Sequence, residues 1–577
     1  MRSTMMDVPL NLKRILEYGS TIHRDTVVTS WNDGEPETTT FGEIGARAAA
    51  FAFALRDELG IDGDQRVGTF MHNCAEHLEV LFAVACMGAV FNPLNKQLME
   101  DQIGHIIRHA QDQVIVVEPR LAQKLAEIIR DCPGVKAVVI TGTGPLDEVD
   151  FPEQVAVYSY EQLLDGRSTS YPWPTLDEHT AAAICYSTGT TGAPKGVAYS
   201  HRSMYLHAMN LRSNDSFAVS YGETFLCCVP IYHVLSWGVP IAGFMAGTPL
   251  VFPGADVSAP SLAQIIAASH PRVAHGVPTL WISLMVHYLK NPPERMSLTE
   301  IIVGGSPAPP ILIRLWEEHY GVDVVHIWGM TETSPVGTVS RPPLGASGED
   351  RWNYRISQGR FPASVQYRVV NDGHVVSATD RNQGEIQVRG NWVTGAYYRS
   401  VEEQAGGSAA VFRGEPVDNA PDMFTPDGWL RTGDVGSVTA DGFLTIEDRA
   451  RDVIRSGGEW IYSVQLENLV MEAPVVVEAA VIGYPDEKWG ERPLAVTVLH
   501  RDVARGEEED RHTAERLRDR LREKLPSWML PEYWTFVDAI DKTSVDKFDK
   551  KDLRQHLRDG DFTIIKLKGP GEGSSSN

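Results

Sequence analysis

The 577-residue sequence predicts an α/β protein with more than one domain, because a chain of this length exceeds what a single core can hold. Residues from about 40 to 345 alternate helical patterns with short apolar strand patterns, which is typical of an α/β sheet. Residues from about 365 to 447 contain short alternating strands and turns, such as 385–388, and predict a smaller β-rich subdomain. The chain after Arg449 has the pattern of a compact α+β unit.

The first elements follow from local patterns. Thr40 followed by Phe41, Gly42 and Glu43 predicts the start of a helix that runs toward Leu59. The next segments alternate in the same way: a strand at 66–71, a helix at 76–87, a strand at 113–117 and a buried strand at 181–185.

The C-terminal part has its own pattern. Residues 475–482 and 494–499 are expected to be strands, and 513–524 an amphipathic helix whose charges form a solvated face. The tail 568–577, KGPGEGSSSN, is expected to be disordered.

Composition excludes several classes of protein. The net charge of −24 argues against binding to nucleic acid or to anionic lipid. The six cysteines show no CxxC spacing and predict reduced, buried thiols in a cytoplasmic protein. The first residues, MRSTMMDVPLNLKRIL, lack a long apolar stretch, so no signal peptide is expected. Residues 234–252 carry no charge and approach the length of a membrane span. Their glycines and prolines favour a broken strand–helix pattern inside a protein core, so no transmembrane segment is expected.

One loop carries the strongest functional signal. The string YSTGTTGAPKG at 186–196 follows the apolar strand and combines hydroxyls, glycines and one lysine. Glycines let the backbone close around a polyanion, exposed N–H groups bind phosphate oxygens, and lysine adds a positive charge. The string matches neither the P-loop nor the GxGxxG fingerprint. It predicts chemistry on a nucleotide triphosphate, with a polar surface turn as the alternative.

This loop resembles the phosphate loop of the acyl-adenylate-forming superfamily, which includes acyl-CoA synthetases, firefly-type luciferases and adenylation domains. Further strings match the superfamily in the same order along nearly the whole chain. They are GGSPAP at 304–309, HIWGMTETSP at 326–335, GEIQVRG at 384–390, GWLRTGDVG at 428–436, EDRARDVIRSGGEWIYSVQLEN at 447–468 and KTSVDKFDKKDLR at 542–554.

The resemblance implies a large multi-subdomain N-terminal domain at 1–448, a hinge at 449–452 and a small mobile α+β domain at 453–567, with the active site between the two domains. It implies an ATP-dependent reaction with Mg²⁺, in which a carboxylate is joined to AMP and a thiol then attacks. Candidate nucleotide-binding residues by this resemblance are Ser187, Thr188, Gly189, Thr190, Thr191, Gly192, Lys195, Gly305, Ser306, Trp328, Gly329 and Met330.

Within this set, Thr188 and Lys195 are expected at the β- and γ-phosphates. Thr331 and Glu332 match the positions at the α-phosphate and magnesium, with Thr188 as a second candidate metal ligand, because a hard cation prefers oxygen ligands. Trp328 stands where the family often has tyrosine, and its ring is expected to stack on adenine, with a core aromatic as the alternative.

Two further groups match the family. Asp434 matches the carboxylate that holds the ribose hydroxyls, and Arg449 matches a second ribose contact. Lys547 matches the C-terminal lysine that reaches the carboxylate and α-phosphate during adenylation. Asp546 stands where the family usually has glycine. For the surrounding lysines, among them Lys550, a solvated basic run is the alternative interpretation.

The second half-reaction needs a thiol. Gly457 and Gly458 match the segment that the family brings to the pantetheine tunnel when its small domain rotates, which makes CoA the expected co-substrate. Arg451 stands at the hinge position, where Asp or Lys is more usual.

The acyl group is suggested by VPIYHVLSWG at 229–238, which resembles the corresponding segment of fatty-acyl-CoA synthetases. His233 matches a position near the carboxylate and is a further candidate catalytic residue. Trp237 matches a tryptophan that gates the acyl tunnel in some bacterial members, with core packing as the alternative. A medium- or long-chain fatty acid is therefore the expected substrate, since each buried CH₂ contributes about 0.8 kcal/mol.

Three alternatives remain open at this point. An aryl- or short-chain acyl-CoA ligase would share the machinery, and a fatty acyl-AMP ligase would pass its adenylate to a carrier protein. A non-catalytic nucleotide or acyl-AMP sensor is the alternative from another class. Resemblance to bacterial fatty-acid ligases suggests a homodimer.

Overall fold

The computed structural model divides the chain into two compact units. Unit 1 comprises Met1–Tyr367 with Val388–Leu430, and unit 2 comprises Arg368–Gln387 with Arg431–Asn577. The structure describes residues 1, 3–142, 149–187, 193–371, 373–376, 383–400, 403, 411–412, 415–416, 423–456, 459–542 and 548–567. The predicted disordered tail at 568–577 lies outside these residues.

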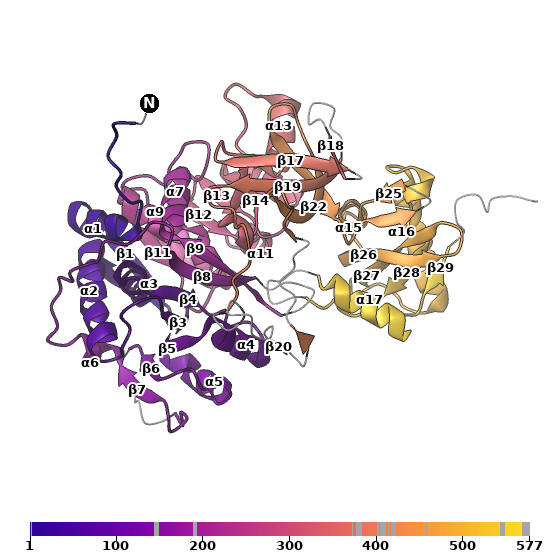
Figure 1. The fold of residues 1–577 in the computed structure, drawn as a ribbon. Coiled ribbons are helices and arrows are strands. Elements are labelled where there is room, and N and C mark those ends of the chain that lie inside the picture. Colours follow the sequence, from indigo (N-terminus) through magenta and orange to yellow (C-terminus); the bar gives the residue numbers. More distant parts are fainter. Residues whose placement is uncertain are drawn as a thin grey trace, which may run out of the picture. The chain divides into compact units, whose positions relative to one another are not determined.

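Unit 1 has the α/β architecture that the sequence predicts. Its helices are α1 (Leu12–Ile22), α2 (Phe41–Asp57), α3 (Ala75–Met87), α4 (Glu100–Ala110), α5 (Pro119–Ile129), α6 (Tyr160–Leu164), α7 (His201–Leu211), α8 (Val234–Trp237), α9 (Val239–Ala246), α10 (Ala259–Ser269), α11 (Pro278–Lys290), α12 (Pro310–Tyr320) and α13 (Gly348–Ile356), with the 3₁₀ turn η1 (Thr331–Thr333). In Figure 1, α1, α2 and α3 lie side by side in indigo and violet.

One sheet of unit 1 has the order β7-β6-β5-β3-β4-β8-β9. All neighbours are parallel except β8 and β9. Its strands are β3 (Arg66–Phe70), β4 (Val90–Pro93), β5 (Asp112–Val117), β6 (Ala137–Ile140), β7 (Ala156–Ser159), β8 (Ala181–Ser187) and β9 (Lys195–Ser200). The central strands are nearly continuous apolar runs, as expected for parallel strands buried on both faces.

The second run of strands in unit 1 has the order β16-β15-β14-β13-β12-β10-β11-β1-β2. Strands β14, β13, β12, β10, β11 and β1 are parallel neighbours. The strands are β1 (Val27–Asn32), β2 (Glu35–Thr40), β10 (Phe225–Cys227), β11 (Leu250–Phe252), β12 (Val273–Gly276), β13 (Glu300–Val303), β14 (Asp323–Gly329), β15 (Val336–Val339) and β16 (Gly359–Arg360), and the pair β20 (Val411–Phe412) and β21 (Glu415–Pro416) lies apart.

Unit 2 is an α+β unit, as predicted. Its strands are β17 (Val365–Asn371), whose first residues fall in unit 1, β18 (His374–Val376), β19 (Gly384–Gly390), whose last residues do, β22 (Leu430–Val438), β23 (Phe443–Arg449), β24 (Ile454–Ser456), β25 (Glu459–Ile461), β26 (Val476–Asp486), β27 (Gly490–Leu499), β28 (Tyr533–Phe536) and β29 (Ile565–Lys566). Its helices are α15 (Ser463–Met471), α16 (Glu507–Arg522) and α17 (Lys550–Asp559), with the 3₁₀ turn η4 (Ser527–Met529).

Local signals explain several boundaries. The Thr40 hydroxyl accepts a hydrogen bond from the Glu43 amide, and the Glu43 carboxylate accepts one from the Thr40 amide. This capping box starts α2 where the sequence predicts it. The uncharged segment 234–252 is broken into α8, α9 and β11, as expected. No helix in the described ranges combines the length and the apolar character that a membrane crossing requires.

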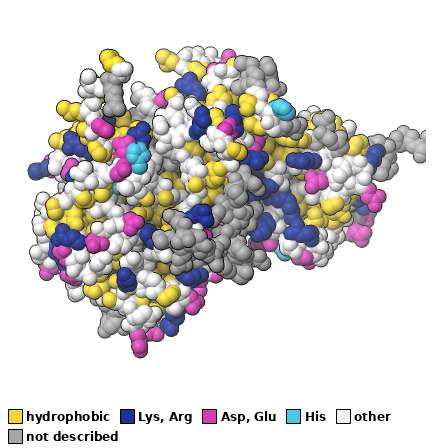
Figure 2. Space-filling model, viewed as in Figure 1, with side chains coloured by type: hydrophobic (Ala, Val, Ile, Leu, Met, Phe, Trp, Pro, Cys, Tyr) yellow, Lys and Arg dark blue, Asp and Glu magenta, His cyan; other side chains and the backbone are white. Residues whose placement is uncertain are grey.

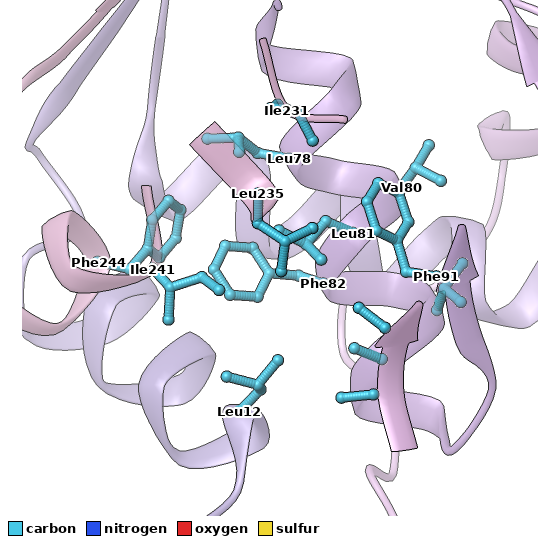
Figure 3. Close-up of a cluster of buried hydrophobic side chains, with 14 of the residues drawn as sticks. Leu12, Leu78, Val80, Leu81, Phe82, Phe91, Ile231, Leu235, Ile241 and Phe244 are labelled. Carbon is cyan, nitrogen blue, oxygen red and sulfur yellow. The ribbon is translucent and has the colours of Figure 1, made fainter. Parts of the chain in front are cut away.

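The largest core of unit 1 joins α1, α2, α3 and α9. Figure 3 shows Phe82, Leu78 and Leu81 of α3 pointing toward Phe244 and toward Leu235. The six cysteines are free thiols, five of them buried, and burial raises the pKa of Cys185 to about 12. The prediction of reduced, buried thiols is thus confirmed for the five.

Buried histidines give unit 1 a specific pH response. His201 of α7 is fully buried, its Nδ1 accepts a hydrogen bond from the Leu12 amide, and burial lowers its pKa from 6.5 to about 4. Between pH 7.5 and 5 the unfolded chain therefore takes up a proton at this ring that the folded chain excludes, and stability is lost as the pH falls. We expect wild-type protein to lose about 2 kcal/mol more unfolding free energy over this interval than H201Q. Urea unfolding at both pH values checks this, and equal losses would contradict it.

Candidate active site

Three of the predicted motifs, and His275, which was not predicted, lie at the ends of adjacent parallel strands. The segment 229–238 follows β10, His275 lies near the end of β12, Gly305 and Ser306 follow β13, and the WGMTE motif spans the end of β14 and η1. The carboxyl ends of parallel strands meet at one edge of a sheet, and in open α/β sheets ligands bind in the crevice outside that edge. The fold of unit 1 therefore collects these motifs at one edge.

The base of the phosphate loop lies at the end of the other parallel run. Ser187, the last residue of β8, pairs with Lys195, the first residue of β9. The loop therefore connects the two strands of an antiparallel hairpin. The predicted phosphate contacts Thr188, Gly189, Thr190, Thr191 and Gly192 lie outside the described residues.

Glu332 is held in place from several sides. Its side chain is buried, and Oε1 accepts a hydrogen bond from the Tyr397 hydroxyl at 2.5 Å. Its carbonyl accepts from the Thr394 amide at 2.8 Å, and the Tyr199 hydroxyl of β9 donates to the Thr331 carbonyl at 2.8 Å. The turn η1 is thereby joined to the strand that leaves the phosphate loop.

Tyr397 connects the two predicted motifs. The Lys195 ammonium lies over its ring, 5.4 Å from the centroid, while its hydroxyl donates to Glu332. Burial, followed by the nearby Glu332, raises the Tyr397 pKa well above its usual range, so the hydroxyl stays a donor. The next residue, Tyr398, donates its amide to the Gly196 carbonyl at 2.7 Å. Tyr397 was not predicted, although the two consecutive tyrosines after Gly395 were a visible signal.

The chemistry of this group fits a magnesium–nucleotide complex. Carboxylate and hydroxyl oxygens of Glu332 and Thr331 suit a hard cation, and Lys195 supplies a positive charge beside them. The backbone after β14 approaches closely as well, since a Cβ on Gly329 would lie 1.7 Å from the Pro335 carbonyl oxygen. A glycine is required there by the packing alone.

The remaining nucleotide candidates of unit 1 are placed as follows. Gly305 has a left-handed φ of 84°, and the loop after it is tied to β14 because the Ala308 amide donates to His326 Nε2 at 3.3 Å. The Met330 amide donates to the Thr333 hydroxyl at 2.9 Å. Trp328 is 8% exposed, with its ring packed against Gly337 and edge-on to Phe361. Adenine stacking on Trp328 stays a prediction.

The two acyl-site candidates differ in exposure. Trp237 is buried and its ring lies edge-on to His275, with 5.2 Å between the centroids, whereas His233 is half-buried beside Tyr232. Apart from His233, residues 225–254 contain no acidic or basic side chain, and most of them are apolar.

Unit 2 holds the ribose candidates. Asp434 of β22 pairs in register with Arg449 of β23, and Arg449 Nε lies 2.9 Å from Asp434 Oδ1. Asp434 is buried, so the carboxylate is kept in one orientation by the guanidinium. Gly457, Gly458 and Lys547 lie outside the described residues. The hinge at 449–452 stays a prediction.

One interpretation of the C-terminal lysines needs correction. The Lys550 side chain is only 12% exposed, and its Nζ lies 2.7 Å from Glu467 Oε1 and 2.6 Å from the Ser463 hydroxyl. Its carboxylate neighbours, Glu467 first, raise the Lys550 pKa against the effect of burial. Lys550 is therefore not part of a solvated basic run, because its ammonium group is paired with Glu467 and Ser463 of α15, about 80 residues earlier in the chain.

Figure 2 shows other Lys and Arg side chains grouped on the part of the visible face formed by unit 2, despite the net charge of −24.

Comparison with known proteins identifies the family. A family model described as AMP-binding enzyme matches residues 19–398, and one described as AMP-binding enzyme C-terminal domain matches residues 465–547. The chain is 35% identical to a 3-methylmercaptopropionyl-CoA ligase of Ruegeria lacuscaerulensis, over 97% of this chain and 99% of the relative. It is 35% identical to a medium-chain-fatty-acid–CoA ligase of Ectopseudomonas oleovorans, over 97% and 98%, and 36% identical to a long-chain-fatty-acid–CoA ligase of Thermus thermophilus, over 96% and 97%.

Solved structures share the fold. The crystal structure of an anthranilate CoA ligase with anthranoyl-AMP has a TM-score of 0.79 and 22% identity, over 97% of this chain and all of that one. Fold and relatives place the protein in the class of AMP-forming acid–thiol ligases. The chain belongs to the AMP-binding enzyme family, within the acyl-adenylate-forming superfamily.

Proposed function

We propose that this protein is a fatty-acid–CoA ligase that acts on a medium- or long-chain acid. The observation that supports it most is the group Lys195, Tyr397 and Glu332 beside Thr331, at strand ends where a nucleotide would bind. The acyl assignment rests on the apolar segment 229–238 and on the medium- and long-chain ligases among the relatives.

In the first half-reaction, a carboxylate oxygen of the fatty acid attacks the α-phosphorus of ATP. A new P–O bond forms, the bond to the β-phosphate oxygen breaks, and pyrophosphate leaves. Lys195 and Lys547 supply positive charge where negative charge develops on the phosphates. Glu332 would hold Mg²⁺, with Thr188 as a second candidate ligand, and Mg²⁺ would neutralise phosphate charge. Thr331 would contact the α-phosphate. Asp434 would accept hydrogen bonds from the ribose hydroxyls.

In the second half-reaction, the CoA thiolate attacks the acyl carbonyl carbon. A C–S bond forms, the C–O bond to AMP breaks, and the thiol proton passes to solvent. Gly457 and Gly458 would allow the pantetheine arm to approach the backbone. His233 lies on the acyl segment, where it would contact the carboxylate.

The substrate is tested by thioester formation from ATP, Mg²⁺ and CoA across C2–C20 fatty acids, benzoate and 3-(methylthio)propionate. A maximum at medium or long chains is the expected result, because each added CH₂ contributes about 0.8 kcal/mol of burial. A maximum at 3-(methylthio)propionate, the acid suggested by the Ruegeria relative, or at benzoate would contradict the fatty-acid proposal. Acyl-AMP without thioester would indicate an acyl-AMP ligase instead.

A further inference from the structure

The acyl segment contains an unusual stretch of backbone. Five consecutive residues are left-handed, with φ of 46° at Val234, 57° at Leu235, 55° at Ser236, 54° at Trp237 and 76° at Gly238. Only the last is glycine, and L-residues avoid this region because Cβ approaches the following carbonyl oxygen. Such strain persists where the surroundings over-determine the conformation, and it concentrates at ligand sites.

Ser236 and His275 link the two ends of the segment 229–236 by hydrogen bonds. The fully buried Ser236 hydroxyl donates to the Val229 carbonyl at 2.7 Å. The Val229 amide donates to His275 Nδ1 at 3.3 Å, and His275 Nε2 lies 3.1 Å from the Ser236 carbonyl. Residues 229 and 236 are thus joined both directly and through one imidazole ring from β12.

The partners of His275 define its tautomer. An amide N–H is always a donor, so Nδ1 accepts and carries no hydrogen, which leaves the hydrogen on Nε2 to be donated to the Ser236 carbonyl. The ring is therefore neutral when both bonds are made. Burial of the whole side chain also lowers the pKa of His275 to about 4.

A third buried side chain, Asn73, also bonds the segment. Asn73, just before α3, accepts from the Ile231 amide at 2.9 Å and donates to the Val229 carbonyl at 2.8 Å. Leu235 points into the apolar core beside α3 (Figure 3). Side chains from outside the segment are therefore hydrogen-bonded to its backbone at Val229, Ile231 and Ser236.

We infer that Asn73, Ser236 and His275 form a positioning network that sets which acyl chains the enzyme accepts. The inference rests on the proposed function. The network fixes the backbone on both sides of His233 and ends at Trp237, whose ring lies edge-on to His275. A shift of the strained turn moves both side chains together, which changes the acyl site while leaving Lys195 of β9 and Glu332 of η1 in place.

The test compares kcat/KM for the preferred acid with that for an acid four carbons shorter, together with the KM for ATP. We expect S236A and H275L to change this ratio at least fivefold and to leave the ATP KM within twofold of wild type. H275Q keeps an acceptor and a donor in one side chain, and it is expected to restore the ratio to within twofold. H201L is the matched control, since it removes a buried histidine that accepts one amide bond elsewhere in unit 1, and its ratio should equal that of wild type.

An unchanged ratio in S236A would overturn the inference, as would an equal change in H201L or a parallel rise in the ATP KM. S236A removes a single oxygen and carries the test if H275L does not fold. A wild-type enzyme that forms no fatty acyl-CoA at all would contradict the proposed function instead, so the two failures are distinguishable.

Discussion

The variant E332Q is expected to form acyl-AMP about 10²–10³-fold more slowly than wild type. Glutamine keeps the shape of the side chain and its contact with the Tyr397 hydroxyl, but removes the negative charge that a hard cation requires. ATP–pyrophosphate exchange with the preferred fatty acid at saturating Mg²⁺ measures this step without CoA.

Y397F is the matched control for this prediction. It removes one donor to the carboxylate but keeps both the charge and the aromatic ring beneath Lys195. We expect a smaller loss of about tenfold, because a hydrogen bond to a charged group contributes about 1.5–3 kcal/mol. If E332Q exchanged pyrophosphate within threefold of wild type while its unfolding midpoint was unchanged, Glu332 would not be the metal-binding carboxylate.

The variant K547A is expected to separate the two half-reactions. Lys547 matches only the adenylation arrangement of the family, so its loss should slow acyl-AMP formation about 10²–10³-fold. Thioester formation from supplied acyl-AMP and CoA should stay within threefold of wild type. Single-turnover measurements of each half-reaction check both statements.

The control for K547A lies in the same basic run. Lys551 is exposed at the start of α17, and K551A removes an equal charge from a position with no assigned role. It should leave both half-reactions near wild type. Equal losses of both half-reactions in K547A would remove the assignment, and equal losses in K551A would trace the effect to net charge.

The elements that the sequence predicts best are those with local signals. The Thr40–Glu43 capping box, the apolar strand β8 and the interrupted segment 234–252 all depend on neighbouring residues, and the structure has each of them. Three motifs follow β10, β13 and β14, which are parallel strands of one sheet. Their position at one edge of that sheet therefore also follows from the predicted alternation of strands and helices.

Features that depend on distant partners were not predicted. Tyr397 reaches Glu332 across 65 positions, and the largely covered Lys550 forms an ion pair with Glu467 of α15. In the segment 234–238 only Gly238 signals a left-handed conformation. Among the other four residues, Ser236 is held by two buried hydrogen bonds, from its hydroxyl to the Val229 carbonyl and from His275 Nε2 to its carbonyl, and no local propensity reveals them.

The central claim is that the enzyme activates a fatty acid through AMP and transfers it to CoA. The most direct measurement is the product balance with ATP, Mg²⁺, CoA and the preferred acid, followed by chromatography. The account predicts acyl-CoA, AMP and pyrophosphate in equal amounts. Formation of ADP and inorganic phosphate, or of AMP without acyl-CoA, would contradict it.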